Sequence, residues 1–410
     1  MRRSSAKARA GVTHQDNRAE GWEAVPFGAS IRRTNARTTK VQRANYRQSG
    51  QYPIIDQGQG FIAGYWDRQD DIYPGELPVI VFGDHTRVFK FVDFPFVVGA
   101  DGTQLLVPDT TRFDPYFLYL AYSSLNIPSR GYNRHFSLLK EQTIVMPPLG
   151  EQRAIARVLR TVQEAKEACE RVIAATRQLK ESLLHHLFTY GPTPFDGTAR
   201  VSLRETEIGP IPAHWGLSRF GEAVEIASGQ VDPREKPYSD MFHVGPEHIE
   251  AGSGRLRPLS TAADAGLISG KYLFTDQDVL YSKIRPYLRK AALPTFTGIC
   301  SADMYPLRPK RGLGREFLFF WLLSDMFTRA IVPSQGRTGI PKVNREQINA
   351  TPLPVPPETE QKQIASELSA VDAKLRAEET RHGALVSLFA SVLDSLMSGR
   401  VRLPEFVRGS

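Results

Sequence analysis

The sequence has 410 residues, of which 41% are hydrophobic and 23% charged, and its formal net charge is +8. No apolar run approaches the roughly 20 residues that a membrane-spanning helix needs, and the two cysteines are too few for a disulfide framework. The composition therefore predicts a cytoplasmic protein without membrane contact, built from more than one domain because single cores rarely exceed about 250 to 300 residues.

The positive charge is concentrated near the N-terminus. Residues 1 to 50 contain 11 Lys+Arg against 3 Asp+Glu, and the remaining charges balance. Residues 1–21 lack the apolar stretch of a secretory signal and form a basic arm. This arm is either a disordered, solvated tail or a segment that binds a polyanion, and the same alternatives stay open for Arg32 to Arg47.

Residues 22–146 predict a first globular domain that mixes strands with a helix. Strand-like runs occur at QYPIID, LPVIVFGD, RVFKFVDFPFVVGADG and TQLLVP, and a helical FDPYFLYLAYSSL follows. The glycine-rich QGQGFIAG is interpreted as a turn rather than a phosphate-binding loop, because no clear helix follows it. Asp84 and His85 are interpreted as a turn cap beside a polar histidine.

Residues 147–190 predict a long helix, followed by a linker at residues 191–208. The helix opens with PPLGEQRAIA and has no Pro or Gly between Gly150 and Gly191. Its apolar-leaning positions alternate steps of three and four, which is typical of a coiled coil. This seam consists of Ile155, Val158, Val162, Ala165, Cys169, Val172, Thr176, Leu179 and Leu183.

The second half of the chain repeats this order. Residues 209–355 predict a second globular domain, with strand candidates at KYLFTDQDVLYSKI and AALPTF and a helical REFLFFWLLSDMF. Residues 356–400 predict a second long helix, which opens with PPETEQKQIA, and residues 401–410 form a tail. Its seam is Ile364, Leu368, Val371, Leu375, Leu385, Phe389, Val392 and Leu396, around a polar middle at Glu378 and His382.

The repeated phrase indicates an internal duplication. The two proline pairs lie 209 residues apart, and Trp22 and Trp215 hold matching places before them. The fold class is therefore α+β, with two similar domains and two long helices that pair as an antiparallel coiled coil with pseudo-twofold symmetry. Homo-oligomerisation through the same seams is the alternative.

Each long helix begins with Glu-Gln, a basic residue and, two positions later, Ile. A carboxylate in the first turn favours the positive end of the helix dipole, so capping explains the glutamates. A protein partner that binds both helix starts explains the whole phrase equally well. The candidate partner-binding residues are Glu151, Gln152, Arg153, Glu360, Gln361 and Lys362.

The sequence contains none of the catalytic or metal-binding motifs sought. Walker, HExxH, CxxC and Asp/Asn-Pro-Pro-aromatic patterns are missing, and Asp276 and Asp278 near Lys283 are only a weak nuclease signal. Instead, GDHTRVFKF and YSKIRPYLRK mix cations with aromatic residues, as do GYNRHF and GRTGIPK later in each domain, which is typical of loops that contact DNA. The candidate DNA-binding residues are Arg87, Lys90, Arg134, Lys283, Arg285, Arg289, Arg337 and Lys342.

These stretches, with GPIPAHW and DVLYSKIRPYLRKAALPTFTGICSADMYPL, resemble the DNA specificity (S) subunits of bacterial type I restriction-modification systems over nearly the whole chain. The resemblance implies that the two domains are target recognition domains for an asymmetric, split target in double-stranded DNA. It also implies that the helices space the half-sites and dock modification (M) subunits, two of them by the duplication, and that restriction (R) subunits join for phage defence.

On this resemblance the chain is non-catalytic and binds no cofactor. S-adenosylmethionine, ATP and Mg are expected on the partner subunits, which methylate adenine in DNA and restrict it. The alternatives are a specificity subunit of a related restriction or methylation system, or a coiled-coil scaffold that binds DNA without sequence preference.

Overall fold

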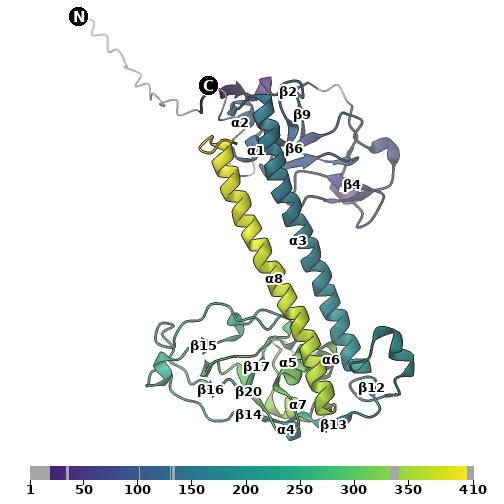
Figure 1. The fold of residues 1–410 in the computed structure, drawn as a ribbon, viewed down its shortest axis with the longest axis vertical. Coiled ribbons are helices and arrows are strands. Elements are labelled where there is room, and N and C mark those ends of the chain that lie inside the picture. Colours follow the sequence, from purple (N-terminus) through teal and green to yellow (C-terminus); the bar gives the residue numbers. More distant parts are fainter. Residues whose placement is uncertain are drawn as a thin grey trace, which may run out of the picture. The chain divides into compact units, whose positions relative to one another are not determined.

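The computed structural model describes residues 19–33, 37–100, 102–129, 131, 134–332 and 341–403. The chain divides into two compact units: unit 1 is Met1–Ala168 with Gly383–Ser410, and unit 2 is Cys169–His382. Each unit contains one globular domain and paired segments of the two long helices α3 (Leu149–Tyr190) and α8 (Glu358–Met397) (Figure 1). We call the globular parts domain 1 and domain 2.

The strands of domain 1 form one two-stranded pair and two four-stranded sheets, in the orders β1-β10, β2-β9-β6-β7 and β3-β8-β4-β5. In the last sheet β3 and β4 run parallel to β8, and the other pairings are antiparallel. The strands are β1 Glu23–Pro26, β2 Ile31–Arg32, β3 Lys40–Val41, β4 Tyr52–Ile55, β5 Gly64–Trp66, β6 Val79–Gly83, β7 Phe89–Val92, β8 Val97–Gly99, β9 Thr103–Pro108 and β10 Thr143–Met146.

Helix α1 (Pro115–Ser123) packs on the β2-β9-β6-β7 sheet, and the short α2 (Phe136–Lys140) precedes β10. Asp114 starts α1 because its carboxylate accepts hydrogen bonds from the backbone N–H groups of Tyr116 and Phe117. Phe117 is fully buried in a core that also contains Ile155 and Leu159 of α3. The beginning of α3 is thus part of the core of domain 1.

Domain 2 repeats the arrangement with shorter strands, in the orders β11-β12, β13-β21, β14-β20-β17-β18 and β15-β19-β16. Strands β15 and β19 are parallel, as β4 and β8 are in domain 1. The strands are β11 Leu203–Arg204, β12 Ile211–Pro212, β13 Gly216–Arg219, β14 Val224–Ile226, β15 His243–Val244, β16 Tyr272–Phe274, β17 Val279–Ser282, β18 Ala291–Ala292, β19 Gly298–Cys300, β20 Met304–Pro309 and β21 Pro352–Val355.

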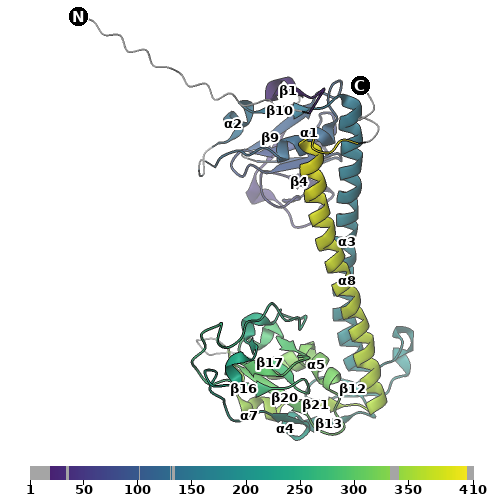
Figure 2. The same cartoon turned by 60° about the vertical axis from the view of Figure 1, so that its left-hand side comes forward.

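The helices of domain 2 are α4 Phe220–Ala223, α5 Arg315–Leu323, α6 Asp325–Ile331 and α7 Arg345–Ala350. Helix α5 packs on the sheet that contains β17 and β20 (Figure 2), and Phe188 of α3 contacts its Phe317 and Trp321. The helical run predicted here is two helices, because the Ser324 hydroxyl accepts from Phe327 N and starts α6.

The two domains confirm the predicted duplication and the α+β class. In both, an antiparallel strand pair (β1-β10 or β13-β21) leads directly into a long helix, and a nine-residue helix (α1 or α5) follows a six-residue strand (β9 or β20). The element order therefore repeats even though the loops between the elements differ in length.

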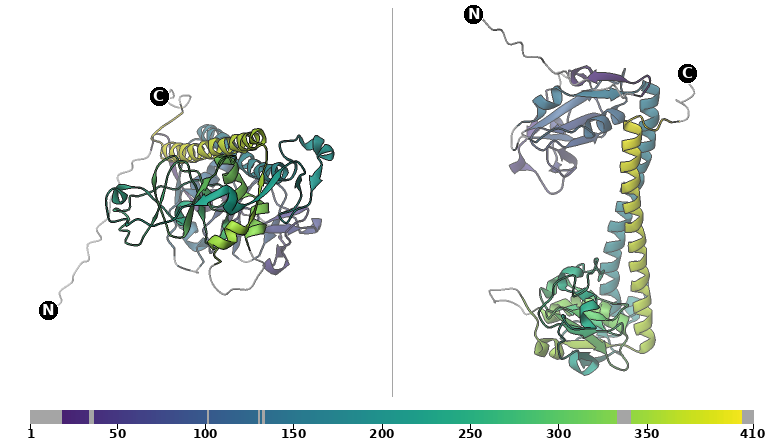
Figure 3. Two further views of the ribbon diagram at one scale, coloured as in Figure 1. Left: turned by 90° about the horizontal axis from the view of Figure 1, so that it is seen from below. Right: turned by 90° about the vertical axis from the view of Figure 1, so that its left-hand side faces the viewer.

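The long helices run antiparallel within each unit. In unit 2, Lys180 Nζ lies 2.7 Å from Asp372 Oδ1, and Glu170 Oε1 lies 2.8 Å from His382 Nε2. The earlier residue of α3 thus contacts the later residue of α8, which is the antiparallel order. In unit 1, Lys166 Nζ lies 5.0 Å from the ring centroid of Phe389. The views in Figure 3 agree that α3 and α8 lie side by side. The predicted pairing is confirmed.

The buried face of α3 differs from the predicted seam at three positions. Ile155, Cys169 and Thr176 are buried as expected, but three predicted positions are exposed: Val158, Val172 and Leu179. In each case the following residue is buried instead: Leu159, Ile173 and Lys180. Hydrophobicity alone favours Leu179, whereas the structure buries Lys180 because Asp372 neutralises its charge inside the helix pair.

Candidate nucleic-acid interface

The β6–β7 and β17–β18 hairpins hold arginines in an unusual backbone conformation. Among the described residues, the non-glycine residues with positive φ are Arg87 (63°), Arg285 (49°) and Arg289 (48°). All three lie in these two matching hairpins. Left-handed backbone costs a residue with a Cβ about 1 to 2 kcal/mol, and such strain clusters at functional sites. The sequences GDHTRVFKF and YSKIRPYLRK form the turns of these two hairpins, so they occupy equivalent places in the two domains, as the duplication predicted.

In domain 1 two exposed arginines lie near each other in the fold: Arg87 in the β6–β7 turn and Arg134 just before α2. Arg87 donates from Nη1 to the carbonyl of Ile127 at 2.8 Å, and the Arg134 side chain is 81% exposed. Arg134 lies near the buried Asp84, whose carboxylate accepts from the backbone N–H groups of His135 and Phe136 at 2.7 Å. The sequence predicted that Asp84 caps its own turn, but its carboxylate instead binds the backbone at the start of α2. Both arginines remain candidates for DNA contact.

Lys90 has a different role from the one predicted. Its side chain is 3% exposed, and Nζ donates to the carbonyls of Asp56 at 2.7 Å and Gly60 at 2.6 Å. Burial lowers the pKa of Lys90, while the Asp56 carboxylate 3.8 Å away favours its charged form. The prediction that Lys90 contacts DNA is wrong in this geometry, because β7 directs the side chain beneath the glycine-rich segment.

In domain 2 the corresponding hairpin presents Arg285 to solvent. Its side chain makes no hydrogen bond or ion pair with the part of the chain that the structure describes. Lys283 and Lys342 both approach Asp303, with Nζ–Oδ1 distances of 3.9 and 3.3 Å. Lys342 is more than half exposed and Lys283 lies 5.5 Å from the ring centroid of Tyr305. All three stay predictions for DNA binding.

Arg289 is occupied by contacts within unit 2. Its guanidinium pairs with Asp325 of α6 and with Glu181 of α3, the latter at 3.2 Å. A side chain held between two helices is not available to DNA, so the prediction for Arg289 is wrong here. Arg337 lies outside the described residues.

A lysine that the sequence reading passed over repeats the role of Lys90. Lys290 Nζ donates to the carbonyl of Pro246 at 2.6 Å, and burial lowers its pKa. Pro246 follows β15 just as Asp56 follows β4, and both strands run parallel to a neighbour. Each hairpin thus carries a lysine that holds the loop after the equivalent strand. The signal in the sequence is a lysine at the start of the second hairpin strand, since Lys90 is the second residue of β7 and Lys290 directly precedes β18.

The glutamates at the two helix starts bind the two matching tryptophans. Trp22 Nε1 donates to Glu151 Oε2 at 3.3 Å, and Trp215 Nε1 donates to Glu360 Oε2 at 2.8 Å. Their remaining partners differ. Arg402 donates to Glu151 from Nε and Nη2 at 3.0 and 2.7 Å, whereas Glu360 lies 2.7 Å from His214 Nε2.

The glutamines at the helix starts make the same three contacts in both units. Gln152 accepts from Asp114 N at 2.9 Å and donates to the carbonyls of Pro147 and Arg112. Gln361 accepts from Gly314 N at 2.7 Å and donates to the carbonyls of Pro356 and Gly312. Each glutamine thus ties the first turn of its helix to the loop before α1 or α5.

These contacts decide between the two interpretations of the repeated phrase for most of its residues. Glu151, Gln152 and Gln361 are 1 to 2% exposed, so their role is to anchor the helix, and the prediction that they contact a partner is wrong in this geometry. The Glu360 side chain is 22% exposed and satisfied by His214 and Trp215. Arg153 and Lys362 are exposed and stay candidates for partner contact.

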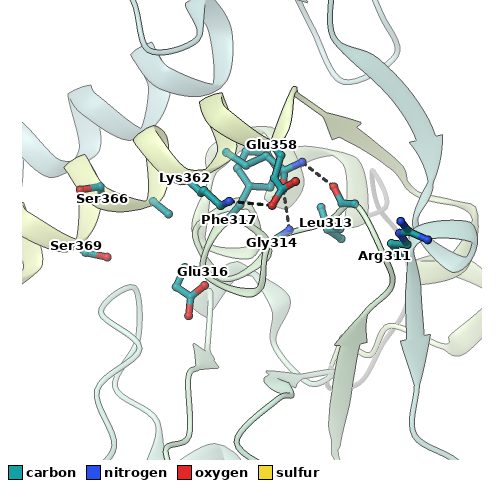
Figure 4. A pocket seen from close by; sticks show the side chains of 12 residues that line it. Arg311, Leu313, Gly314, Glu316, Phe317, Glu358, Lys362, Ser366 and Ser369 are labelled. Carbon is teal, nitrogen blue, oxygen red and sulfur yellow. Dashed lines mark hydrogen bonds and ion pairs between the residues drawn. The ribbon is translucent and has the colours of Figure 1, made fainter.

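A pocket of about 590 Å³ lies beside the start of α8. Glu358 and Lys362, which form an ion pair at 2.9 Å, border it near Gly314, and Glu316, Ser366 and Ser369 border it elsewhere (Figure 4). In unit 1 the residue that matches Ser369 is Arg160, whose guanidinium lies 5.0 Å from the ring centroid of Tyr116. The two helix starts are therefore alike in their anchors and unlike on their outer faces.

The described residues contain one group that could hold a metal ion: His243, Glu247 and His248 of domain 2. His248 Nδ1 already accepts a 2.9 Å hydrogen bond from Gly245 N, so this nitrogen is engaged within its own turn.

No described helix is long and apolar enough to span a membrane.

The chain matches the type I restriction modification DNA specificity domain over residues 27–175 and again over residues 212–385. It belongs to the type I restriction-modification DNA specificity family. This confirms the resemblance seen in the sequence and the role in DNA sequence specificity. The two matched regions correspond to the two copies of the duplication, each with part of its long helix.

Relatives in the same family support this assignment. The chain is 31% identical over 239 residues to the EcoDI specificity subunit of Escherichia coli, covering 54% of this chain and 53% of the relative. It thus spans about half the length of that relative. It is 22% identical to the MjaVIII specificity subunit of Methanocaldococcus jannaschii, with 94% of each chain covered.

Two solved structures share the fold. The S subunit from M. genitalium superposes with a TM-score of 0.61 at 17% identity, covering 92% of this chain and 96% of that one. A chain from a study of complex assembly and conformational transition in a type I R-M system gives a TM-score of 0.51 at 16% identity, covering 93% and 99%.

Proposed function

We propose that the chain reads a split, asymmetric target in double-stranded DNA, with one half-site for each domain. The observation that carries this proposal is the pair of matching hairpins with left-handed arginines, Arg87 in domain 1 and Arg285 in domain 2. Equivalent placement indicates a shared task, while their surrounding residues differ. Unlike hairpins bind unlike base sequences, so the two half-sites differ.

The same proposal assigns the chemistry to partner chains. Two M subunits, which carry S-adenosylmethionine and methylate adenine, dock on the long helices. R subunits that use ATP and Mg join them, and the complex acts on DNA in the bacterial cytoplasm. The chain itself binds no cofactor and catalyses nothing. The exposed Arg153 and Lys362 support docking at the helix starts, because neither is needed for the internal anchors described above.

The test is methylome sequencing of cells that express the chain with its M subunits. We expect methylated adenines within a two-part, non-palindromic target. Arg87→Ala should weaken recognition of one half-site and Arg285→Ala that of the other. A palindromic target, or variants that alter both half-sites equally, would contradict the assignment. Methylation without any sequence preference would favour a non-specific DNA scaffold.

The helices provide a second test. A heptad inserted into α3 with a matching heptad in the paired part of α8 preserves the antiparallel seam. The proposal expects a longer spacer between two unchanged half-sites. A spacer that stays constant would show that helix length does not set it.

A further inference from the structure

The glycine-rich segment Asp56–Ala63 between β4 and β5 lines a pocket of about 530 Å³ in domain 1. His85 and Thr86 of the β6–β7 turn form another part of its wall, and the rest is lined by Gln42, Arg43, Tyr46 and Ala100. The segment is a turn between strands, as expected from the sequence. It nevertheless lies against the hairpin that carries Arg87, so it borders the surface assigned to DNA.

The backbone of this segment is fixed from several directions. Lys90 holds the carbonyls of Asp56 and Gly60 from the buried side. Thr86 Oγ1 donates to the carbonyl of Gln57 at 2.5 Å, and His85 N donates to the Gln57 side-chain oxygen at 3.1 Å. A loop held in this way presents its outward side chains in a defined geometry, which recognition requires.

The fixed loop leaves several polar side chains unengaged. Gln42, Arg43 and Gln59 are exposed, and none forms a side-chain hydrogen bond or ion pair with the residues that the structure describes. Among the nearby basic residues, Arg47 is occupied by Asp67. The wall of the pocket thus presents amide and guanidinium groups that are available to a ligand.

Two large apolar side chains are exposed on the same loop. Phe61 is 45% exposed and Ile62 is 43% exposed, although both follow a segment whose backbone is tightly held. Ile62 also lines the pocket. A glutamine amide can donate to and accept from adenine in the major groove, and apolar side chains contact the thymine methyl group. Amide and apolar groups on one loop therefore match the edge of an A·T pair.

We propose that the loop Asp56–Ala63 reads an A·T base pair in the half-site of domain 1, with Gln59 as the specificity-determining residue and Lys90 as its positioning residue. This inference rests on the proposed function of the chain. Gln59 contacts the base edge, Ile62 lies against the thymine methyl group, and Arg43 contacts the DNA beside that pair. Lys90 acts through the loop and does not touch DNA.

The first experiment compares Gln59→Ala with the unchanged chain, each coexpressed with the M subunits, by methylome sequencing. Discrimination at one A·T position of one half-site should fall by about tenfold or more, as for other bidentate base contacts. All positions of the other half-site should stay unchanged. Glu76→Gln, an exposed change elsewhere in domain 1, is the control that should leave both half-sites intact.

The second experiment tests the positioning role with a matched pair of variants. Lys90→Met should relax the same A·T position as Gln59→Ala, whereas Lys290→Met should affect only the other half-site. Thermal unfolding of each variant shows whether its chain is folded. A loss of stability alone would reduce methylation at all positions together, while the positioning role predicts relaxed discrimination at one.

The outcomes separate this inference from the proposed function. If the unchanged chain directs methylation to a split target but Gln59→Ala and Lys90→Met keep full discrimination at every position, the inference is overturned and the proposed function stands. Relaxation of both half-sites by either variant also overturns it. If the unchanged chain directs no sequence-specific methylation, the proposed function itself fails.

Discussion

The starts of the two long helices use one sequence phrase in two environments. Glu151 is 1% exposed and is bound by the guanidinium of Arg402, whereas Glu360 is 22% exposed and is bound by His214 and Trp215. Both glutamates accept from a tryptophan, and both neighbouring glutamines make identical contacts. The comparison shows that the glutamine contacts and the tryptophan–glutamate hydrogen bond are the constant parts of the anchor, while the further partner of the glutamate differs: Arg402 in unit 1 and His214 in unit 2.

The largest expected effect is that of Glu151→Ala. The change leaves Arg402 without its bidentate partner and Trp22 Nε1 without an acceptor, and breaking a buried ion pair costs about 3 kcal/mol. Urea unfolding monitored in unit 1 measures this loss. Glu360→Ala should cost less than half as much because its site is partly hydrated. Equal losses would refute the difference between the two environments.

Gln152→Leu and Gln361→Leu should have equal effects on stability, because the two glutamines make the same three contacts. Each change removes the acceptor for a backbone N–H and the donor for two carbonyls at one helix start, at a cost of about 2 kcal/mol. The unfolding free energies of the two variants, measured under one condition, check this. A clear inequality would mean that the glutamine contacts are not equivalent.

Arg160→Ala should lower stability by about 1 kcal/mol. The guanidinium lies over the rings of Phe91 and Tyr116 and pairs with Asp93 at 2.7 Å, but these groups are partly exposed. Ser369→Ala at the matching position of α8 is the control, since Ser369 only borders a pocket. Thermal unfolding of both variants tests whether the outer face of α3 is packed at Arg160 while that of α8 is unpacked at Ser369.

The smallest expected effect is that of His214→Ala. Its ring is more than half exposed, so loss of the hydrogen bond to Glu360 should cost about 0.5 kcal/mol or less. Arg402→Ala should cost more, because it leaves the buried Glu151 carboxylate without its cation. A larger loss for the histidine variant would reverse the assignment of the stronger anchor.

The sequence predicted the order of elements well, because that order depends on local patterns. TQLLVP corresponds to β9, and the proline pairs precede both long helices closely. The seam of α3 was predicted less well. A rule based on hydrophobicity chose Leu179, and only the position of Asp372 on the other helix explains why Lys180 is buried instead.

The candidate site shows the same limit. Arg87 and Arg285 could be selected from cations and aromatic residues in matching stretches, and the structure places both in matching hairpins. Lys90 and Arg289 belong to the same stretches, but their side chains point to Asp56 and Asp325, which are distant in sequence. Sequence composition does not distinguish a lysine that contacts solvent from one that closes a loop.

The contact between Arg402 and Glu151 has a consequence for synthesis of the chain. Unit 2 is one continuous segment, so the ribosome delivers all of it before residues 383–403 that complete unit 1. Leu396 is part of the core of unit 1, and Arg402 neutralises its buried glutamate. Domains usually fold in the order in which they are made. Unit 1 is therefore begun first but completed last. The face of α3 that packs against α8 in unit 1 stays exposed until residues 383–403 have been made.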